Sequence, residues 1–511
     1  MGLEEKVRVL KDLKERVKKG GGQKRTERQH EQKKLTARER IEKLLDPGSF
    51  QEIYSLASLD FSLAKKDSFG DGVITGHGKI DGRVVCLYAQ DTTIMGGSVG
   101  VIHRFKVCHC IDTAAEMGVP LIALNDSAGE RIQKEMQLTH GSNFFSYSMA
   151  SGKVPLISVI LGNCAGNAVY GAALTDFVFM VEGISHMTIT GPRVIKEMTG
   201  EDISMEDLGG ARVHTEISGC ADFRCATEED CFQMVRKLVG FLPLSYKEFP
   251  PRVLPGDDPD RDVEGMEGLI PDDRKKYYDA RKVMEKIFDR GDFFEVKKPF
   301  APNIITGFAR LDGYAVGVVA NQPRFLSGAL TVDSSDKEAR FIRFCDSFNI
   351  PLVFLIDVPG YFPGKDQEYK GIIRHGAKVL YAISESTVPK VSVILRKGYG
   401  GGITAMGGHA ALGVDRIYSW PSGELAVMDP LAAVNLLFRE EMQKAPNPEE
   451  FKKDKVREFE ERFYTPYYSA ANLRLHEVIA PGETRRFLIR TMELLRGKTS
   501  PRRIPHGNIP L

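Results

Sequence analysis

Two loops of small residues, each placed directly after an apolar segment, are the best candidates for chemistry in this sequence. The first is Cys164-Ala165-Gly166-Asn167-Ala168 and the second is Gly398-Tyr399-Gly400-Gly401-Gly402. Glycine has no side chain, so backbone N–H groups in such loops can approach a ligand closely. If a helix begins there, its first amides have no internal partner and point outward. Such amides stabilise a developing oxyanion, as many acyl transformations require.

A purely structural role remains open for each loop, because glycines also permit tight packing of a strand against a helix. For one loop the two interpretations are evenly balanced. Two loops at matching positions favour function, since packing does not require both to keep the feature. Asp126 and Asp357 each follow an apolar segment and are either catalytic carboxylates or helix caps.

Other catalytic signatures are missing from the sequence. It contains no Gly-x-Ser-x-Gly, phosphate-binding loop or His-Glu-x-x-His motif, and its eleven histidines do not cluster. Cys108-His109-Cys110 has a spacing that points the two thiols apart on a helix, so we expect no metal site. The eight cysteines are expected to be buried thiols rather than disulfides. The pattern therefore favours catalysis by oriented backbone amides.

The two loops belong to a duplicated chain. Residues 118–129 reappear as residues 349–360, 231 positions later, and Ile80-Asp81-Gly82 reappears as Leu311-Asp312-Gly313 at the same offset. The segment before the first loop, residues 154–161, returns as residues 388–395. The sequence therefore predicts two copies of one fold, each carrying one loop.

Each copy is predicted to be an α/β domain. Residues 70–85 have the pattern of two strands joined by an Asp-Gly turn, followed by a helix at 101–117 and an apolar strand at 119–124. Near-continuous apolar strands separated by helix-length segments indicate a parallel sheet covered on both faces. Residues 1–45 are charged and helical, with Thr36 expected to cap a helix together with Glu39.

Length and composition set the remaining expectations. A chain of 511 residues exceeds one ordinary core, so we expect domains at 1–257 and 258–511, joined within a stretch rich in proline and aspartate. A net charge of +1 gives no argument for nucleic-acid binding, and no apolar stretch is long enough to span a membrane. The start has no apolar targeting segment, so a cytoplasmic location is expected.

Beyond these patterns, the chain resembles the carboxyltransferase (beta) subunits of biotin-dependent acyl-CoA carboxylases, especially propionyl-CoA carboxylase. It is also similar to the alpha subunits of methylmalonyl-CoA decarboxylases. The segments that carry the resemblance occur in the same order over nearly the whole chain. They are residues 34–41, 45–50, 70–76, 173–177, 207–211, 366–369, 371–378 and 506–511.

The resemblance implies two tandem crotonase-like (ClpP/crotonase) domains, the first for acyl-CoA and the second for biotin. It implies a hexamer whose sites lie between the first domain of one subunit and the second domain of another. Biotin, carried on a partner carboxyl carrier protein and carboxylated by a partner biotin carboxylase, would arrive carboxylated, and its carboxyl group would be transferred between carboxybiotin and the alpha carbon of an acyl-CoA. No metal is implied in this subunit.

The resemblance also assigns site residues. The amides at Gly166 and Asn167 would hold the thioester oxygen, and those at Gly401 and Gly402 the ureido oxygen of biotin. Substrate-binding positions are expected at Ala128, Gly129, Tyr361 and Thr404, the last lining the acyl pocket. Asn167 stands where the family usually has glycine, and Thr404 stands where propionyl-specific members have aspartate, so the acyl group stays open.

Three alternatives remain at this point. A sodium-pumping acyl-CoA decarboxylase would run the same half-reaction in reverse. A biotin-independent crotonase-type lyase would need a carboxylate on the thioester. A catalytically silent scaffold subunit would follow if Asn167 disrupted the first loop.

Overall fold

The computed structural model describes residues 2–58, 69–131, 142–261, 263–498 and 505–510. The chain forms two compact units, residues 1–249 with 505–510 and residues 250–504. The division falls within the segment rich in proline and aspartate, and residues 505–510 belong to the first unit. There Asn508 donates a hydrogen bond to the Asp176 carboxylate at 3.0 Å.

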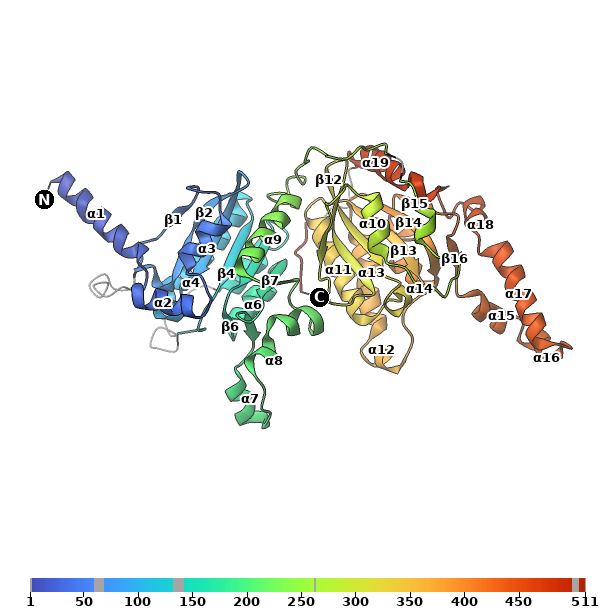
Figure 1. Ribbon diagram of the computed structural model, residues 1–511, viewed down its shortest axis with the longest axis horizontal. Helices are drawn as coiled ribbons and strands as arrows, with labels where there is room; N and C mark the ends of the chain where they lie inside the picture. Colours follow the sequence, from blue (N-terminus) through green and yellow to red (C-terminus); the bar gives the residue numbers. More distant parts are fainter. Residues whose placement is uncertain (1, 59–68, 132–141, 262, 499–504, 511) are drawn as a thin grey trace. The chain divides into compact units, whose positions relative to one another are not determined.

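The first unit is built on a seven-stranded sheet in the order β1-β2-β3-β4-β5-β7-β9, with a separate pair β6-β8 (Figure 1). Strands β3 to β9 of this sheet pair in parallel, and β2 pairs antiparallel with β1 and β3. The strands are β1 (Gln51–Ile53), β2 (Val73–Ile80), β3 (Arg83–Gln90), β4 (Leu121–Asn125), β5 (Leu156–Ile160), β6 (Asn163–Ala165), β7 (Phe177–Val181), β8 (His186–Thr188) and β9 (Phe223–Cys225).

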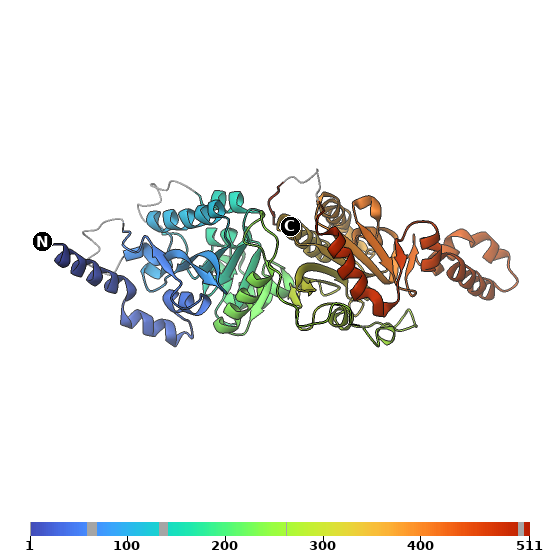
Figure 2. The ribbon, with the colours of Figure 1, turned by 90° about the horizontal axis from the view of Figure 1, so that it is seen from above.

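Helices cover both faces of this sheet. Helices α4 and α5 pack on one face, where Val107, Ile111 and Tyr147 join the core, and α3 and α9 pack on the other (Figure 2). The helices are α1 (Leu3–Lys18), α2 (Gln23–Glu31), α3 (Ala37–Leu44), α4 (Val101–Met117), α5 (Asn143–Ala150), α6 (Asn167–Ala173), α7 (Pro192–Thr199), α8 (Met205–Gly209) and α9 (Glu228–Phe241).

The second unit repeats this architecture. Its sheet has the order β10-β11-β12-β13-β14-β15-β17, with β16 also paired to β14. The strands are β10 (Phe294–Val296), β11 (Ile304–Leu311), β12 (Tyr314–Asn321), β13 (Leu352–Val358), β14 (Lys390–Tyr399), β15 (Arg416–Ser419), β16 (Glu424–Ala426) and β17 (Glu477–Val478).

Its helices also lie on both faces of the sheet, with α11 packed on α13 and with α10 and α19 on the opposite face (Figure 2). The helices are α10 (Ala280–Ile287), α11 (Val332–Ser347), α12 (Lys365–Tyr369), α13 (Ile372–Glu385), α14 (Gly400–Ala405), α15 (Pro430–Leu437), α16 (Arg439–Lys444), α17 (Pro448–Phe463), α18 (Pro466–Ala471) and α19 (Thr484–Leu495). The predicted α/β class with a parallel, doubly covered sheet is confirmed in both units.

Local signals in the sequence are reproduced as expected. The Asp81-Gly82 turn joins β2 to β3 with both residues at positive φ, 49° and 78°, a conformation suited to aspartate and glycine. Its copy, Asp312-Gly313, has φ values of 51° and 75°. Thr36 caps α3 in a reciprocal capping box with Glu39, as predicted.

Buried lysines lock the same helix to the sheet in each unit. The Lys106 ammonium, on α4, donates to the carbonyls of Gly70 and Val73. The Lys337 ammonium, at the equivalent place on α11, donates to the carbonyls of Phe300 and Ile304 at 2.8 and 2.9 Å. Each helix is thereby fixed to the segment that begins β2 or β11.

Candidate functional site

The first loop follows the buried strand β5 and the short strand β6. Gly166 adopts φ 62° and ψ −131°, a conformation that only glycine takes readily, and the chain then enters α6 at Asn167. Its amide donates to the carbonyl of Thr188 in β8 at 3.0 Å. The Gly166 amide is therefore engaged within the fold, and the amides that open the helix belong to Asn167 and Ala168.

A second segment approaches this loop from the end of β4. A Cβ placed on Gly129 would lie 3.9 Å from the carbonyl oxygen of Ala165, so the two loops are neighbours. The Ala128 amide donates to the Gly96 carbonyl at 2.9 Å, and the Gly129 amide donates to Ser127 Oγ at 3.1 Å. These contacts hold the segment in place beside the helix α6.

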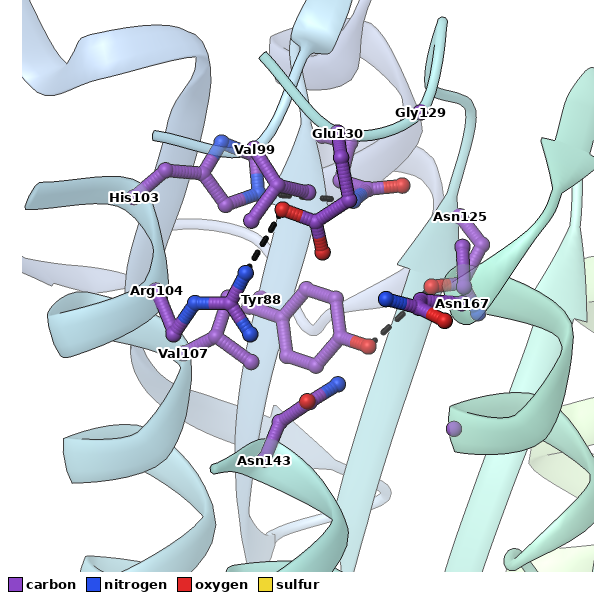
Figure 3. Close-up of a pocket in the computed structure, with 13 residues that line it drawn as sticks. Tyr88, Val99, His103, Arg104, Val107, Asn125, Gly129, Glu130, Asn143 and Asn167 are labelled. Carbon is purple, nitrogen blue, oxygen red and sulfur yellow. Dashed lines mark hydrogen bonds and ion pairs between the residues drawn. The ribbon is translucent and has the colours of Figure 1, made fainter. Parts of the chain in front are cut away.

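A pocket opens between these loops and α4 (Figure 3). It brings together Gly129 and Asn167, two of the predicted site residues, whereas Ala128 is exposed and does not line it. Its lining residues are Tyr88, Gln90, Val99, His103, Arg104, Val107, Asn125, Gly129, Glu130, Asn143, Asn167, Ala168 and Gly171.

Polar side chains from several elements line this pocket. Arg104 donates to the Glu130 carboxylate at 2.6 Å, and the Tyr88 hydroxyl donates to Asn125 Oδ1 at 3.0 Å (Figure 3). His103 is fully buried, and burial lowers its pKa to about 3, so it is neutral. A histidine with so low a pKa is a poor base at neutral pH.

These polar groups were not singled out from the sequence. His103 and Arg104 lie in the predicted helix 101–117, and Glu130 directly follows Gly129. The sequence could have indicated Glu130, because it is adjacent to a predicted site residue. It could not have indicated that Glu130 pairs with Arg104, because this pairing depends on how α4 packs against the end of β4.

The second loop has the same construction in the second unit. Gly400 has φ 56° and begins α14, as Gly166 precedes α6. A Cβ on Gly402 would lie 2.8 Å from Gly360 Cα and 3.0 Å from Val358 Cγ2, so this position has no room for a side chain. A Cβ on Gly401 would make only ordinary contact with the Tyr361 ring, at 3.7 Å. The structure thus brings Tyr361, Gly401 and Gly402 together.

The supporting contacts around the loops are also duplicated. The Val99 amide donates to the Gly129 carbonyl at 2.9 Å, and the Leu330 amide donates to the Gly360 carbonyl at 3.0 Å. Glu130 and Tyr361 therefore occupy equivalent positions. Glu130 forms a parallel bridge with Val99, and Tyr361 forms one with Leu330. One scaffold is therefore used twice, with different side chains at the key position.

Thr404 lies on α14, three residues after Gly401, and is half-buried. Its carbonyl accepts from the Gly407 amide at 3.2 Å. The role predicted for it, lining the acyl pocket, stays a prediction.

The two aspartates left open by the sequence have structural partners. Asp126 is buried and pairs with Lys34 at 2.6 Å and with Arg40 at 3.0 Å. Asp357 is buried and pairs with Arg396 at 3.0 Å, and burial raises its pKa. Both carboxylates anchor the strand ends through buried ion pairs.

Comparison with known proteins identifies the scaffold. The profile of the carboxyl transferase domain matches residues 28–509. The chain belongs to the carboxyl transferase family. The carboxyltransferase subunit of propionyl-CoA carboxylase from Haloferax mediterranei is 48% identical over 518 residues, covering 100% of both chains. The alpha subunit of methylmalonyl-CoA decarboxylase from Veillonella parvula is 47% identical, covering 100% of this chain and 99% of that protein.

A solved structure has the same fold. The transcarboxylase 12S subunit, in a hexamer assembly with methylmalonyl-coenzyme A and methylmalonic acid bound, superposes with a TM-score of 0.95 at 45% identity, covering 100% of this chain and 99% of that one. The resemblance to a family of carboxyltransferases and the crotonase-like fold class are confirmed. In the described ranges, no cluster of three or more His, Cys, Asp or Glu side chains is arranged to hold a metal ion, and no described helix has the length and apolar character of a membrane span.

Proposed function

We propose that this protein is the carboxyltransferase component of a biotin-dependent acyl-CoA carboxylase. It would move a carboxyl group between carboxybiotin on a carrier protein and the alpha carbon of an acyl-CoA. The observation that carries this proposal is the pair of matched loops, one in each unit, each opening a helix with glycine in a left-handed conformation. Two oxyanions arise in such a transfer, and each needs its own set of donors.

The first loop would serve the acyl-CoA. Asn167 and Ala168 line a pocket, and the donors that stabilise a thioester enolate must lie about 3 Å from its oxygen. Gly166 contributes conformation and a fixed contact to β8 rather than an amide of its own. Asn167 keeps its backbone N–H, so its replacement of glycine is compatible with an active loop.

The second loop would serve biotin. Carboxybiotin supplies both the carboxyl group and, after release of carbon dioxide, the base that removes the alpha proton. The chain's own contribution is the amides at Gly401 and Gly402, with the Tyr361 ring beside them. An exposed Gly401 gives access to the loop, and a buried Gly402 lets it pack closely against Gly360.

The alternatives differ in what they require of these residues. A decarboxylase would use the same loops in reverse, and the similarity to a methylmalonyl-CoA decarboxylase subunit keeps this direction as the second candidate. A biotin-independent lyase would need a carboxylate available to the thioester, but Glu130, the carboxylate that lines the pocket, is ion-paired to Arg104. We therefore place the lyase third.

Assembly and partners follow from the same proposal. The similar 12S subunit forms a hexamer, and we propose a hexamer here, with sites completed by the first unit of one subunit and the second unit of another. A biotin carboxylase and a biotin carboxyl carrier protein would be its partners. A cytoplasmic location remains a prediction.

The test is direct transfer. The purified chain would be incubated with carboxylated carrier protein and acetyl-, propionyl-, butyryl- or glutaconyl-CoA, and carboxyl transfer to each would be measured. Methylmalonyl-CoA with uncarboxylated carrier tests the reverse direction. Transfer that depends on biotin supports the proposal. Turnover of an acyl-CoA without any biotinyl protein would contradict it.

A further inference from the structure

A buried carboxyl group in the second unit has no partner within the fold. Glu338 lies on α11 with 0% of its surface exposed, and neither carboxyl oxygen has a hydrogen-bond partner among the described residues. Burial raises the pKa of this carboxyl well above its usual range, which favours its neutral form. An unpartnered buried polar group is costly, which makes a function for it worth seeking.

A second unpartnered polar group lies nearby, on Tyr361. Its ring packs beside Gly401, and its hydroxyl points to α13, where a Cβ on Gly376 would lie only 2.7 Å from the phenolic oxygen. That hydroxyl is buried and has no hydrogen-bond partner among the described residues. Burial raises the pKa of this phenol, the Glu338 carboxyl raises it further, and the Ser335 hydroxyl beside it lowers it.

The neighbouring polar side chains are engaged elsewhere, in part or in full. Ser335, the hydroxyl residue beside the phenol, donates its proton to the Thr331 carbonyl at 2.7 Å, which leaves only its oxygen to accept from the phenol. Asp336, the next residue on α11, is paired with His375 and Lys378. A neutral carboxyl and a phenol each offer one donor and at least one acceptor, so they complement one another.

The first unit shows that this pair is an addition to the shared scaffold. Val107 stands 231 residues before Glu338, on the same turn of α4, and Glu130 stands at the place of Tyr361. Both Val107 and Glu130 line the open pocket of the first unit. In the second unit, Glu338 takes the place of Val107, and Tyr361 takes the place of Glu130. The Tyr361 ring lies beside the glycine loop.

We propose that Glu338 is a positioning residue that is joined to the Tyr361 hydroxyl through one bridging water, and so holds the ring against Gly401. The inference rests on the proposed function, because Gly401 is there assigned to the biotin side of the reaction. A ring held in this way forms a fixed wall beside the donors of the second loop. Its loss should affect the biotin carrier and leave acyl-CoA unaffected.

The kinetic test uses Glu338→Leu, Tyr361→Phe, the double variant, and Glu338→Gln as the matched control. Glutamine keeps the shape and the hydrogen bonds of a neutral acid. We expect each of the first two variants to raise KM for the carboxylated carrier roughly 3- to 10-fold, the equivalent of one neutral hydrogen bond, with no further rise in the double variant. KM for acyl-CoA and the behaviour of Glu338→Gln should stay near the parent values.

A stability cycle tests the contact without any activity. The same four proteins are unfolded thermally, and the shift of each unfolding midpoint from that of the parent is compared. The double variant should be as stable as the less stable of the two single variants, because both single changes break the same contact. Additive shifts, or an unchanged carrier KM in folded Glu338→Leu, would overturn the inference. If the parent enzyme transfers no carboxyl group, the proposed function fails, and the stability cycle still decides whether the pair exists.

Discussion

The first unit keeps an open pocket beside its loop, whereas the second unit places an aromatic ring there. One difference lies at an equivalent position: Glu130 pairs with Arg104, and Tyr361 lies against Gly401. The strands, the bridging contacts and the left-handed glycines are otherwise shared. Duplication thus provided two similar loops, and we propose that divergence of a few side chains beside them fits each loop to a different substrate.

The largest expected effect comes from removing one amide of the second loop. Gly401→Pro eliminates an N–H while proline is tolerated in the first turn of a helix, so transfer should fall about 100- to 1000-fold with the fold retained. Gly401→Ala is the matched control, because its Cβ fits at 3.7 Å and the N–H remains. Rates are compared after circular dichroism shows that both variants are folded. Near-normal transfer by the proline variant would remove Gly401 from the site.

The difference between the two units can be removed at one position by giving the first unit the side chain of the second. Glu130→Tyr places an aromatic ring where Tyr361 lies in the copy, and should fill the pocket beside Asn167. We expect KM for acyl-CoA to rise at least tenfold, since a closed pocket loses contacts with the thioester end. Glu130→Gln keeps the size of the side chain and serves as the control. An unchanged acyl-CoA KM in Glu130→Tyr would mean that this pocket is not where acyl-CoA binds.

Thr404 tests how the second unit takes part in substrate choice. Thr404→Ile should favour longer or more apolar acyl groups, and Thr404→Asp should move the preference toward that of propionyl-specific relatives. Changes of this kind shift discrimination by roughly 1–3 kcal/mol. The measurement is the ratio of kcat/KM values across acetyl-, propionyl-, butyryl- and glutaconyl-CoA. Ratios that stay fixed in both variants would show that Thr404 does not line the acyl pocket.

The strained glycine before α6 is expected to matter for stability. Gly166→Ala forces a side chain into a backbone conformation that L-residues rarely adopt, at a cost of roughly 1–3 kcal/mol in the free energy of unfolding. The nearest atom to the new Cβ lies 3.9 Å away, so the effect isolates conformation from crowding. Chemical denaturation measures it. A loss much below this range would mean that the loop relaxes without strain.

Asn167→Gly gives the smallest expected change. The backbone donor remains, so carboxyl transfer should stay within about twofold, with a stability loss of about 0.5–1 kcal/mol for glycine in a helix. The side chain of Asn167 does reach the pocket (Figure 3). A large loss of transfer with normal folding would assign a direct role to that side chain.

The sequence predicted the parts of this molecule that depend on local rules or on repetition. The Asp81-Gly82 turn, the capping box at Thr36 and the α/β class follow from short patterns, and the two loops followed from duplication. Contacts between distant segments could not be predicted from the sequence. The Gly166 amide, for example, donates to the Thr188 carbonyl because β6 pairs with β8. The burial of Glu338 beside Tyr361 likewise depends on how α11 packs, which no spacing in the sequence encodes.

The central claim is that the two loops serve different substrates, and a pair of matched variants tests it most directly. Asn167→Pro and Gly401→Pro each remove one amide, the first beside the pocket and the second beside Tyr361. For each variant, acyl-CoA affinity is measured by calorimetry, and release of carbon dioxide from the carboxylated carrier is measured without acyl-CoA. The account predicts that Asn167→Pro weakens acyl-CoA binding and spares carrier decarboxylation, and that Gly401→Pro does the reverse. Loss of both properties together in either folded variant would contradict it.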